Sequence, residues 1–249
     1  MTTALSLEQV SYSYHTMKQE TTALSSITFD VLSGEFVAVV GPSGCGKSTM
    51  LHLIAKLLPL SGGTIKINGV PIEESTDHIG YMLQKDQLLP WRTIYENVTL
   101  GLKIQNIKDP EAFDKVDRLL ELYGLKDFKN SYPSQLSGGM RQRAALLRTY
   151  MFSKNVALLD EPFSALDTLT KSDMHRWYLD VMDKIHLSTL FITHDIDEAI
   201  LLSDRIYLLT GRPGRITEEI VIREPKPRRK DFNLTEEFLE YKKDILKKL

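Results

Sequence analysis

The sequence lacks several features that would place it in other classes of protein. It has a single cysteine, Cys45, so an intrachain disulfide is excluded and a reducing compartment is favoured. No apolar run reaches the roughly 18 residues that a membrane-spanning helix needs. Lysine and arginine together number 31 against 33 aspartate and glutamate residues, so the basic excess typical of nucleic-acid-binding proteins is missing.

The amino-terminal segment also lacks a targeting signal. No cationic residue precedes Lys18, and the opening MTTALSLEQV has no long apolar core, so we expect no secretory signal peptide. Apolar residues make up 42% of the 249-residue chain and charged residues 26%, which is typical of a folded globular protein and excludes wholesale disorder. If the protein serves a membrane, it must do so through an integral partner.

Strand and helix patterns alternate along much of the chain. Runs that are apolar and β-branched, as expected of strands buried on both faces, occur at 36–40, 156–159 and 190–193. Helical patterns follow at 48–58, where a proline ends the pattern, and at 168–185. This rhythm predicts an α/β fold with a mainly parallel sheet.

Other segments depart from this rhythm. Alternating residues ahead of position 32 predict β structure, and residues 86–153 are rich in helical periodicity, which predicts an inserted helical subdomain. After a basic, proline-rich linker, Asn233 and Glu236 resemble a capping box that would begin a final amphipathic helix. We therefore expect one domain at 1–222, followed by the linker and helix at 223–249.

A glycine-rich segment joins the first buried strand to the first helix. Residues 41–48 read GPSGCGKS and fit the phosphate-loop pattern G-x-x-x-x-G-K-[ST]. Glycines let backbone N–H groups converge on phosphate oxygens, and the helix adds the positive end of its dipole. Lys47 would reach the terminal phosphates and Ser48 would ligate Mg²⁺. Because the match lies between a strand and a helix, nucleotide binding is favoured over a plain glycine-rich turn.

The only thiol of the chain lies inside this loop. The adjacent helix N-terminus and Lys47 would favour the thiolate of Cys45. The alternative is that Cys45 packs inward as a small apolar residue. Nucleotide should protect the thiol from labelling in the first case and not in the second.

Further motifs follow downstream of the loop. LSGGM at 136–140 precedes a helical run that Ser137 can cap, and its glycines leave N–H groups open to an anion. Taken alone, however, this motif favours an ordinary helix start. A buried strand ends in Asp160 and Glu161, of which the first suits a Mg²⁺ contact and the second could polarise an attacking water. His194 follows another strand, where a lone histidine is usually just solvated.

Taken together, these motifs resemble the nucleotide-binding subunit of an ATP-binding-cassette (ABC) transporter over about residues 1–220. They stand in the family's order: an aromatic residue before the loop, GPSGCGKST at 41–49, Gln84 after a strand, LSGGM at 136–140, LLDE at 158–161 with SALD at 164–167, and His194. Met140 replaces the family's usual glutamine. The resemblance implies a P-loop NTPase core with a mainly parallel sheet, an N-terminal antiparallel β subdomain and an inserted α-helical subdomain.

The resemblance also implies a role for each motif residue, with ATP and Mg²⁺ as cofactors. Catalysis is implied for Glu161 as general base and for His194, Gln84 and Lys47. Metal contacts are implied for Ser48, Gln84 and Asp160. Nucleotide contacts are implied for Tyr14, Gly41, Pro42, Ser43, Gly44, Cys45, Gly46, Lys47, Ser48, Thr49, Gln84, Ser137, Gly138, Gly139, Asp167 and His194. Tyr12 is a rival to Tyr14 as the residue that stacks on adenine.

The family resemblance implies partners as well. Two copies would pair head to tail, so that residues 137–139 of one copy complete the ATP site of the other. An integral membrane permease, and through it a substrate-binding protein, would be partners at the cytoplasmic face of the cell membrane, and nucleic acid would not be one. LPWRT at 89–93 and GRPGRI at 211–216 resemble the nitrate, sulfonate and taurine importers, a group that includes some pyrimidine-precursor importers. The alternative is a soluble ABC-type ATPase not engaged in transport.

The segment at 85–96 is the candidate for docking the membrane partner. It follows Gln84 directly, so a push on it could reach the terminal phosphate. Leu88, Leu89, Pro90 and Trp91 form an apolar cluster in it that a buried interface would explain. The alternative is that these residues close the inserted helical subdomain.

Overall fold

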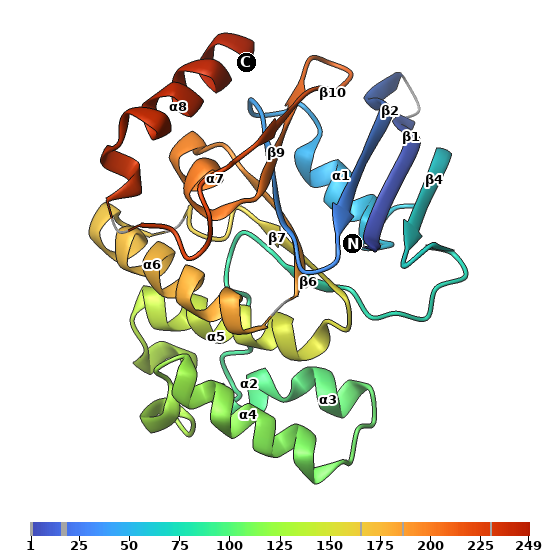
Figure 1. Cartoon of the computed structure of the whole chain (residues 1–249). Helices are drawn as coiled ribbons and strands as arrows, with labels where there is room; N and C mark the ends of the chain where they lie inside the picture. Colours follow the sequence, from blue (N-terminus) through green and yellow to red (C-terminus); the bar gives the residue numbers. More distant parts are fainter. Residues whose placement is uncertain (1, 16–18, 165, 186, 230) are drawn as a thin grey trace. The chain divides into compact units, whose positions relative to one another are not determined.

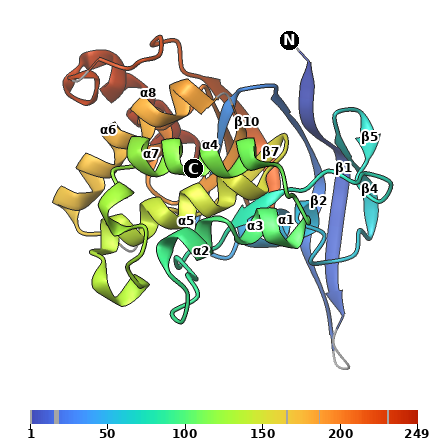
Figure 2. The same ribbon diagram turned by 90° about the horizontal axis from the view of Figure 1, so that it is seen from below.

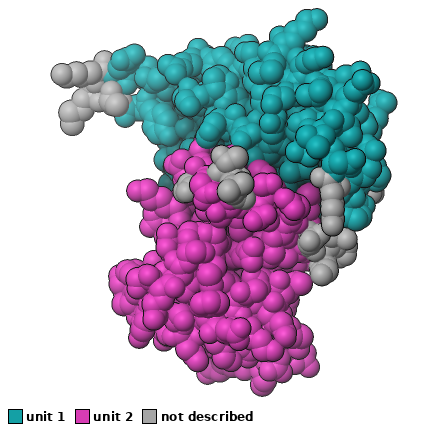
Figure 3. Space-filling model, turned by 90° about the vertical axis from the view of Figure 1, so that its left-hand side faces the viewer, with its two compact units in different colours: residues 1–77, 186–249 teal, residues 78–185 magenta. Residues whose placement is uncertain are grey.

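The computed structural model describes residues 2–15, 19–164, 166–185, 187–229 and 231–249 (Figures 1 and 2). The chain divides into two compact units, which Figure 3 colours separately: unit 1 comprises residues 1–77 and 186–249, and unit 2 comprises residues 78–185. Within the described ranges, no helix is long and apolar enough to cross a lipid bilayer.

Unit 1 begins with an antiparallel sheet whose strand order is β2-β1-β4-β5. Its strands are β1 (Thr3–His15), β2 (Glu20–Leu32), β4 (Gly62–Ile67) and β5 (Val70–Pro71). In β1, Leu5 and Leu7 are buried on one face, and after a bulge, where Gln9 has a φ of 52°, Val10 is buried as well. The predicted N-terminal antiparallel β subdomain is confirmed.

The remaining strands of unit 1 include the predicted parallel ones. They are β3 (Phe36–Val40), β8 (Ser188–Thr193), β9 (Arg205–Thr210) and β10 (Arg215–Val221). β3 pairs in parallel with both β8 and β9, and β10 pairs antiparallel with β9. Every residue of β3 and β8 is buried, which explains why their sequences are continuously apolar or β-branched rather than alternating.

Helix α1 (Lys47–Ile54) is shorter than predicted, and it ends well ahead of Pro59. Its end is a Schellman motif in which Leu57 N donates to His52 O over 2.8 Å. Lys56 adopts the left-handed conformation of this motif, with a φ of 58°. Glycine usually holds that position, so the sequence gives no signal of the helix end.

The C-terminal helix α8 (Glu236–Lys248) is confirmed, but its predicted cap is wrong. Thr235 is the N-cap, and its Oγ1 accepts a hydrogen bond from Phe238 N at 3.3 Å. Asn233 lies in the preceding short 3₁₀ turn instead, and Glu236 is the first helical residue. Thr235 stands only two residues after Asn233, and the Asn233–Glu236 spacing pointed to the wrong residue.

The segment between β10 and α8 is anchored to unit 1. Helix α7 (Ile196–Leu202) packs against β3 and β8, and α8 packs against α7. The Lys226 amine donates to Asp204 Oδ2 at 2.8 Å, and the Arg228 guanidinium donates to Ser203 O at 2.5 Å. The basic stretch that reads as a linker therefore holds polar contacts on the surface of the unit.

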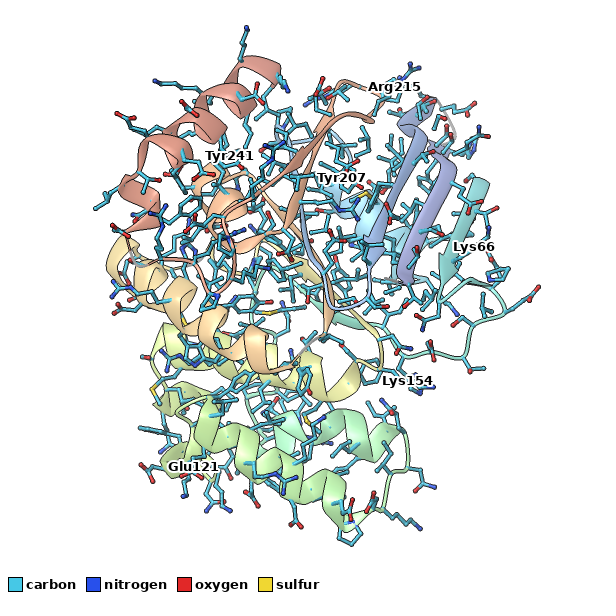
Figure 4. The ribbon with its side chains drawn as sticks, in the orientation of Figure 1. Lys66, Glu121, Lys154, Tyr207, Arg215 and Tyr241 are labelled. Carbon is cyan, nitrogen blue, oxygen red and sulfur yellow. The ribbon has the colours of Figure 1, made fainter. Side chains whose placement is uncertain are left out.

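A partly buried arginine joins several strands of unit 1. Arg205 in β9 donates from Nε and Nη2 to the two carboxylate oxygens of Glu35, at 2.5 and 2.7 Å, and from Nη1 to Tyr207 Oη at 2.8 Å. Figure 4 labels Tyr207. Asp30 and Glu219 complete the ion network. Hydrogen bonding to Glu35 raises the pKa of Arg205 above its ordinary value, so the guanidinium stays charged at any physiological pH.

Unit 2 contains a parallel strand pair and the inserted helices. Strands β6 (Gly80–Met82) and β7 (Val156–Asp160) pair in parallel. The helices are α2 (Ile94–Val98), α3 (Leu100–Ile104), α4 (Pro110–Leu122), α5 (Gly138–Phe152) and α6 (Thr168–Ile185). Helices α2, α3, α4 and α6 all pack against α5 (Figure 2). The α-helical subdomain is confirmed, whereas the domain boundary placed after residue 222 stays a prediction.

Candidate functional site

The phosphate loop of unit 1 closes around the side chain of Lys47. This side chain is buried, and its Nζ donates to Gly41 O at 2.7 Å and to Pro42 O at 3.0 Å. Gly46, with a φ of 103°, is the N-cap of α1, and no side chain caps that end among the described residues. The first N–H groups of α1 therefore remain available to an anion.

The glycines of the loop are required by its geometry. A Cβ on Gly41 would lie 2.0 Å from Leu209 O, so β9 packs directly against the start of the loop. Gly44 has a φ of 79°, in the left-handed region that favours glycine. Pro42, Ser43 and Ser48 are exposed, so the outer rim of the loop and the Ser48 hydroxyl reach solvent.

Cys45 is buried, with 2% of its surface exposed. Burial raises the pKa of its thiol, although the charge of Lys47 and a hydrogen bond from the loop oppose that shift. The expectation that the loop favours the thiolate is therefore wrong. Desolvation outweighs the nearby positive charge, and Cys45 packs inward as the alternative had it.

The two tyrosines near the end of β1 have different environments. Tyr12 is 8% exposed and packs in the core, whereas Tyr14 is 39% exposed. The Tyr14 hydroxyl lies 3.1 Å from Thr49 Oγ1, and its ring packs edge-on against Tyr12 with 5.0 Å between centroids. Tyr14 is thus the exposed aromatic ring beside the start of α1, and the buried ring of Tyr12 packs against it.

His194 follows β8 directly in unit 1 and is exposed. The next residue, Asp195, is the N-cap of α7, and its Oδ1 accepts from Asp197 N and Glu198 N. The histidine therefore lies at a fixed junction between a buried strand and a capped helix. Tyr14, the phosphate loop and His194 all belong to unit 1, while the other predicted site residues belong to unit 2.

In unit 2 the parallel strand pair brings together residues far apart in sequence. Gln84, just after β6, donates from Nε2 to Glu161 Oε2 at 3.1 Å. Tyr81 donates from its hydroxyl to Asp160 Oδ2 at 3.2 Å, and burial together with Asp160 raises the pKa of Tyr81, so the phenol stays a donor. The carboxyl ends of neighbouring parallel strands meet at one edge, which explains this convergence.

Glu161 has an unusual backbone conformation. Its φ is 46°, in the left-handed region that a non-glycine residue rarely adopts. Ser164 holds this conformation, since its N and Oγ donate to Glu161 O at 3.1 and 2.9 Å. Such strain costs about 1–3 kcal/mol and clusters at functional sites, because it aims a side chain that an ordinary conformation would turn away.

The LSGGM segment begins α5 as expected. Ser137 is the N-cap of α5, and its Oγ accepts from Met140 N at 3.3 Å. Gly138 is exposed, whereas a Cβ on Gly139 would lie 3.1 Å from Thr170 Cγ2, so this glycine allows α6 to approach. Asp167 is exposed ahead of α6, and its Oδ1 accepts from Thr170 N at 3.1 Å.

Two arginines of α5 that sequence reasoning missed hold the segment after Gln84. Arg148 donates to Asp86 O and Gln87 O, both at 2.7 Å, and Arg141 donates to Asp86 Oδ2 at 3.1 Å and to Leu136 O. Burial lowers the pKa of Arg148 but leaves it charged. Their spacing of seven residues puts both on one face of α5, the only sequence signal that could have revealed them.

A cavity of about 330 Å³ lies beside Arg141. It is lined by Lys85, Asp86, Gln87, Leu88, Gly138, Arg141, Gln142 and Leu166. Its walls therefore come from the segment after Gln84, from the start of α5 and from the segment after Glu161. All of these elements belong to unit 2.

Comparison with known proteins decides the family of this chain. A family model described as ABC transporter matches residues 24–164. The uncharacterized ABC transporter ATP-binding protein YtlC of Bacillus subtilis is 44% identical over 88% of this chain and 84% of that protein. The chain belongs to the ABC transporter family. Within that family it is an ATP-binding cassette, the ATPase component.

Two further relatives of this ABC ATPase carry functional names. The nitrate import ATP-binding protein NrtD of Synechocystis sp. is 40% identical over 90% of this chain and 86% of that protein. The aliphatic sulfonates import ATP-binding protein SsuB of Bacillus cereus is 40% identical over 97% of this chain and 94% of that protein.

Solved structures of other cassettes share the fold of this ABC ATPase. The cassette MJ0796, in a dimeric post-hydrolysis state bound to ADP and phosphate, matches with a TM-score of 0.74 and 29% identity, over 88% of this chain and 99% of that one. The protein cbiO1 of Clostridium perfringens, part of the ABC transporter complex cbiONQ, matches with a TM-score of 0.78 and 25% identity, over 98% and 100%. The predicted P-loop NTPase fold is thereby confirmed.

The burial of Cys45 yields a prediction about its reactivity. Because the raised pKa lowers the thiolate fraction at a given pH, maleimide labelling at pH 8 should be at least about tenfold slower in the folded protein than in urea. The labelling rate should also begin to increase at a higher pH than it does for an exposed cysteine. A folded-state rate equal to that in urea would show that the thiol is not buried.

Proposed function

We propose that this ABC ATPase powers the import of a small solute through a separate membrane permease. The observation that carries the proposal is similarity over nearly the full length to proteins named for nitrate import and sulfonate import. The solute would be of the nitrate, sulfonate or taurine kind, or a pyrimidine precursor. These import names favour transport over a soluble ABC-type ATPase.

The residues of unit 1 would bind the nucleotide. The N–H groups of the loop from Gly41 to Thr49 would hold the phosphates, with Lys47 exchanging its carbonyl partners for phosphate oxygens. Tyr14 would stack its exposed ring on the adenine. His194 would donate to the terminal phosphate from the end of β8.

Mg²⁺ fits the donors that the chain offers. This ion is usually held by one or two protein oxygens together with substrate phosphates, so no dense protein cage is expected. The described residues contain no cluster of three or more histidine, cysteine, aspartate or glutamate side chains suited to a metal. The Ser48 hydroxyl, the Asp160 carboxylate and the Gln84 amide oxygen would hold the ion, which neutralises charge on the phosphates.

Hydrolysis would depend on Glu161 as general base. The carboxylate would accept a proton from the attacking water, and the Gln84 amide, 3.1 Å away, would help to orient both. The left-handed backbone of Glu161, held by Ser164, would keep the carboxylate aimed without further reorganisation. Asp160 would be the metal contact, with Tyr81 as its hydrogen-bond donor.

A second copy of the chain would complete each ATP site. Ser137 and Gly138 are exposed at the start of α5. Together with Gly139 and Asp167, they would contact the ATP that the other copy holds. The dimeric state of the related cassette MJ0796 supports this arrangement. The complex would lie peripherally at the cytoplasmic face of the membrane, with a substrate-binding protein joining through the permease.

Replacement of Glu161 tests the catalytic assignment. Glu161→Gln keeps the shape of the side chain and its contact with Gln84 but removes the base, so ATP hydrolysis should slow by about 10²- to 10⁴-fold, or about 3–5 kcal/mol of barrier. ATP affinity should stay nearly unchanged, and ATP-bound dimer should accumulate. Single-turnover hydrolysis and sedimentation of the same sample measure both effects.

Glu121→Gln serves as the matched control, because Glu121 is an exposed residue of α4 that pairs with Lys126 at the surface. It should hydrolyse ATP like the unmodified protein. Single-turnover hydrolysis by Glu161→Gln at the control's rate would remove Glu161 from the catalytic role.

The segment at 85–96 would dock a cytoplasmic loop of the permease. Trp91 is 70% exposed and Pro90 is exposed beside it, whereas Leu88 is buried and belongs to the core rather than to the docking surface. The base of the segment is rigid, because Arg148 holds its backbone carbonyls. A displacement of Trp91 by the permease would therefore also displace Gln84 and its partner Glu161.

Truncation of Trp91 tests the docking assignment. Trp91→Ala should weaken capture by the permease and reduce permease-stimulated ATP hydrolysis by about tenfold or more, as expected of an exposed aromatic anchor. ATP affinity of the isolated subunit should change less than about threefold. Ile104→Ala is the control, since Ile104 is 67% exposed in the same unit, at the end of α3. Unchanged capture of Trp91→Ala, or its unfolding, would contradict the assignment.

A further inference from the structure

The turn between β9 and β10 lies against the phosphate loop. Its sequence, GRPGR at 211–215, has no role in the function described above. The Arg212 guanidinium donates from Nη2 to Ser43 O at 3.2 Å. A Cβ on Gly44 would lie only 2.7 Å from the same nitrogen, so the guanidinium covers this part of the loop.

The backbone of the turn is fixed at this place by a strand-like contact. Gly214 N donates to Ala23 O at 2.9 Å, and Ser25 N donates to Gly214 O at 3.0 Å, which forms a parallel bridge with Leu24 of β2. A Cβ on Gly214 would lie 2.0 Å from Cys45 O. Only a glycine therefore allows the turn to pack on the loop.

The end of the phosphate loop contacts the same strand. A Cβ on Gly46 would lie 2.6 Å from Leu24 Cδ2 and 3.0 Å from Ala23 O, and Leu24 is fully buried. Three segments of unit 1 thus meet at one point: the end of the phosphate loop, β2 around Leu24, and the turn at 211–215. Figure 4 labels Arg215 at the β10 end of this turn.

The contact with Arg212 has a consequence for the donors of the loop. In a trans peptide the carbonyl and the following N–H point in opposite directions, and the peptide after Ser43 is trans. When Arg212 holds Ser43 O on the outside, the Gly44 N–H must point to the inside. The next peptide but one follows the same rule. Because Cys45 O packs against Gly214 on the outside, the Gly46 N–H must also point to the inside of the loop.

We propose that the turn at 211–215 is a support that sets the nucleotide affinity of the phosphate loop, with Arg212 as a positioning residue. This inference rests on the proposed binding of ATP phosphates by the loop. Arg212 acts through the peptide it holds and touches no reacting atom. Its charge adds to the positive potential at a loop whose ligand is anionic.

Variants of Arg212 test this support in the full chain. Arg212→Ala should raise the dissociation constant for Mg-ATP by about three- to tenfold, as expected for loss of one charge-assisted hydrogen bond, with the melting temperature nearly unchanged. The KM for ATP should rise in parallel, while kcat at saturating ATP should stay within about twofold. Arg212→Lys, which keeps a donor and the charge, should recover most of the affinity.

Labelling of Cys45 reports on the support without nucleotide. If the support holds the loop closed, Arg212→Ala should label severalfold faster than the unmodified protein. Loss of the guanidinium charge acts in the opposite direction, because that charge lowers the pKa of the thiol, so faster labelling can come only from an opened loop. Arg215→Ala is the matched control, because Arg215 is an exposed arginine of the same turn whose side chain has no hydrogen bond within the described part of the chain. It should behave as the unmodified protein in both measurements.

Equal ATP affinity and equal labelling for Arg212→Ala and Arg215→Ala would overturn the inference. A failure of the unmodified protein to bind ATP would instead overturn the proposed function. The labelling comparison still decides whether the turn supports the loop in that case, because it needs no nucleotide.

Discussion

The interaction on which the site depends most is the contact of the Lys47 amine with the carbonyls of its own loop. Nζ lies 2.7 Å from Gly41 O and 3.0 Å from Pro42 O, so the cation itself curls the loop between β3 and α1. The glycines follow from this curvature, because β9, β2 and the turn after β9 all approach the loop too closely for a Cβ. The phosphate-binding shape is therefore built into unit 1 by packing and does not wait for a ligand.

A second constraint governs unit 2. The parallel pair β6 and β7 brings Gln84 to Glu161, and α5 holds the following segment through Arg141 and Arg148. The helix that begins with Ser137 therefore also determines where the segment after Gln84 lies. A membrane partner acting on Trp91 and a second copy acting at Ser137 would bias the same rigid group of elements, which is what coupling of transport to hydrolysis requires.

Patterns that depend on local chemistry were predictable from the sequence. The buried strand at 36–40, the phosphate loop and the Ser137 cap follow from hydrophobic pattern and from local hydrogen bonding. The errors arose where tertiary contacts or rare conformations decide. Lys56 takes a position that glycine usually holds, desolvation overrides the charge near Cys45, and the partners of Arg148 and Arg212 lie more than 60 residues away in sequence. No local pattern encodes such contacts.

Amide hydrogen exchange of the phosphate loop tests the central claim most directly, because it measures the donors that the account assigns to the phosphates. The exchange of residues 41–49 would be compared with and without Mg-ATP, at protein concentrations too low for pairing of copies. The account predicts that ATP strongly slows exchange of the N–H groups in this loop, while the exposed turns of unit 2 stay unchanged. ATP binding that leaves exchange in the loop unaltered would contradict it.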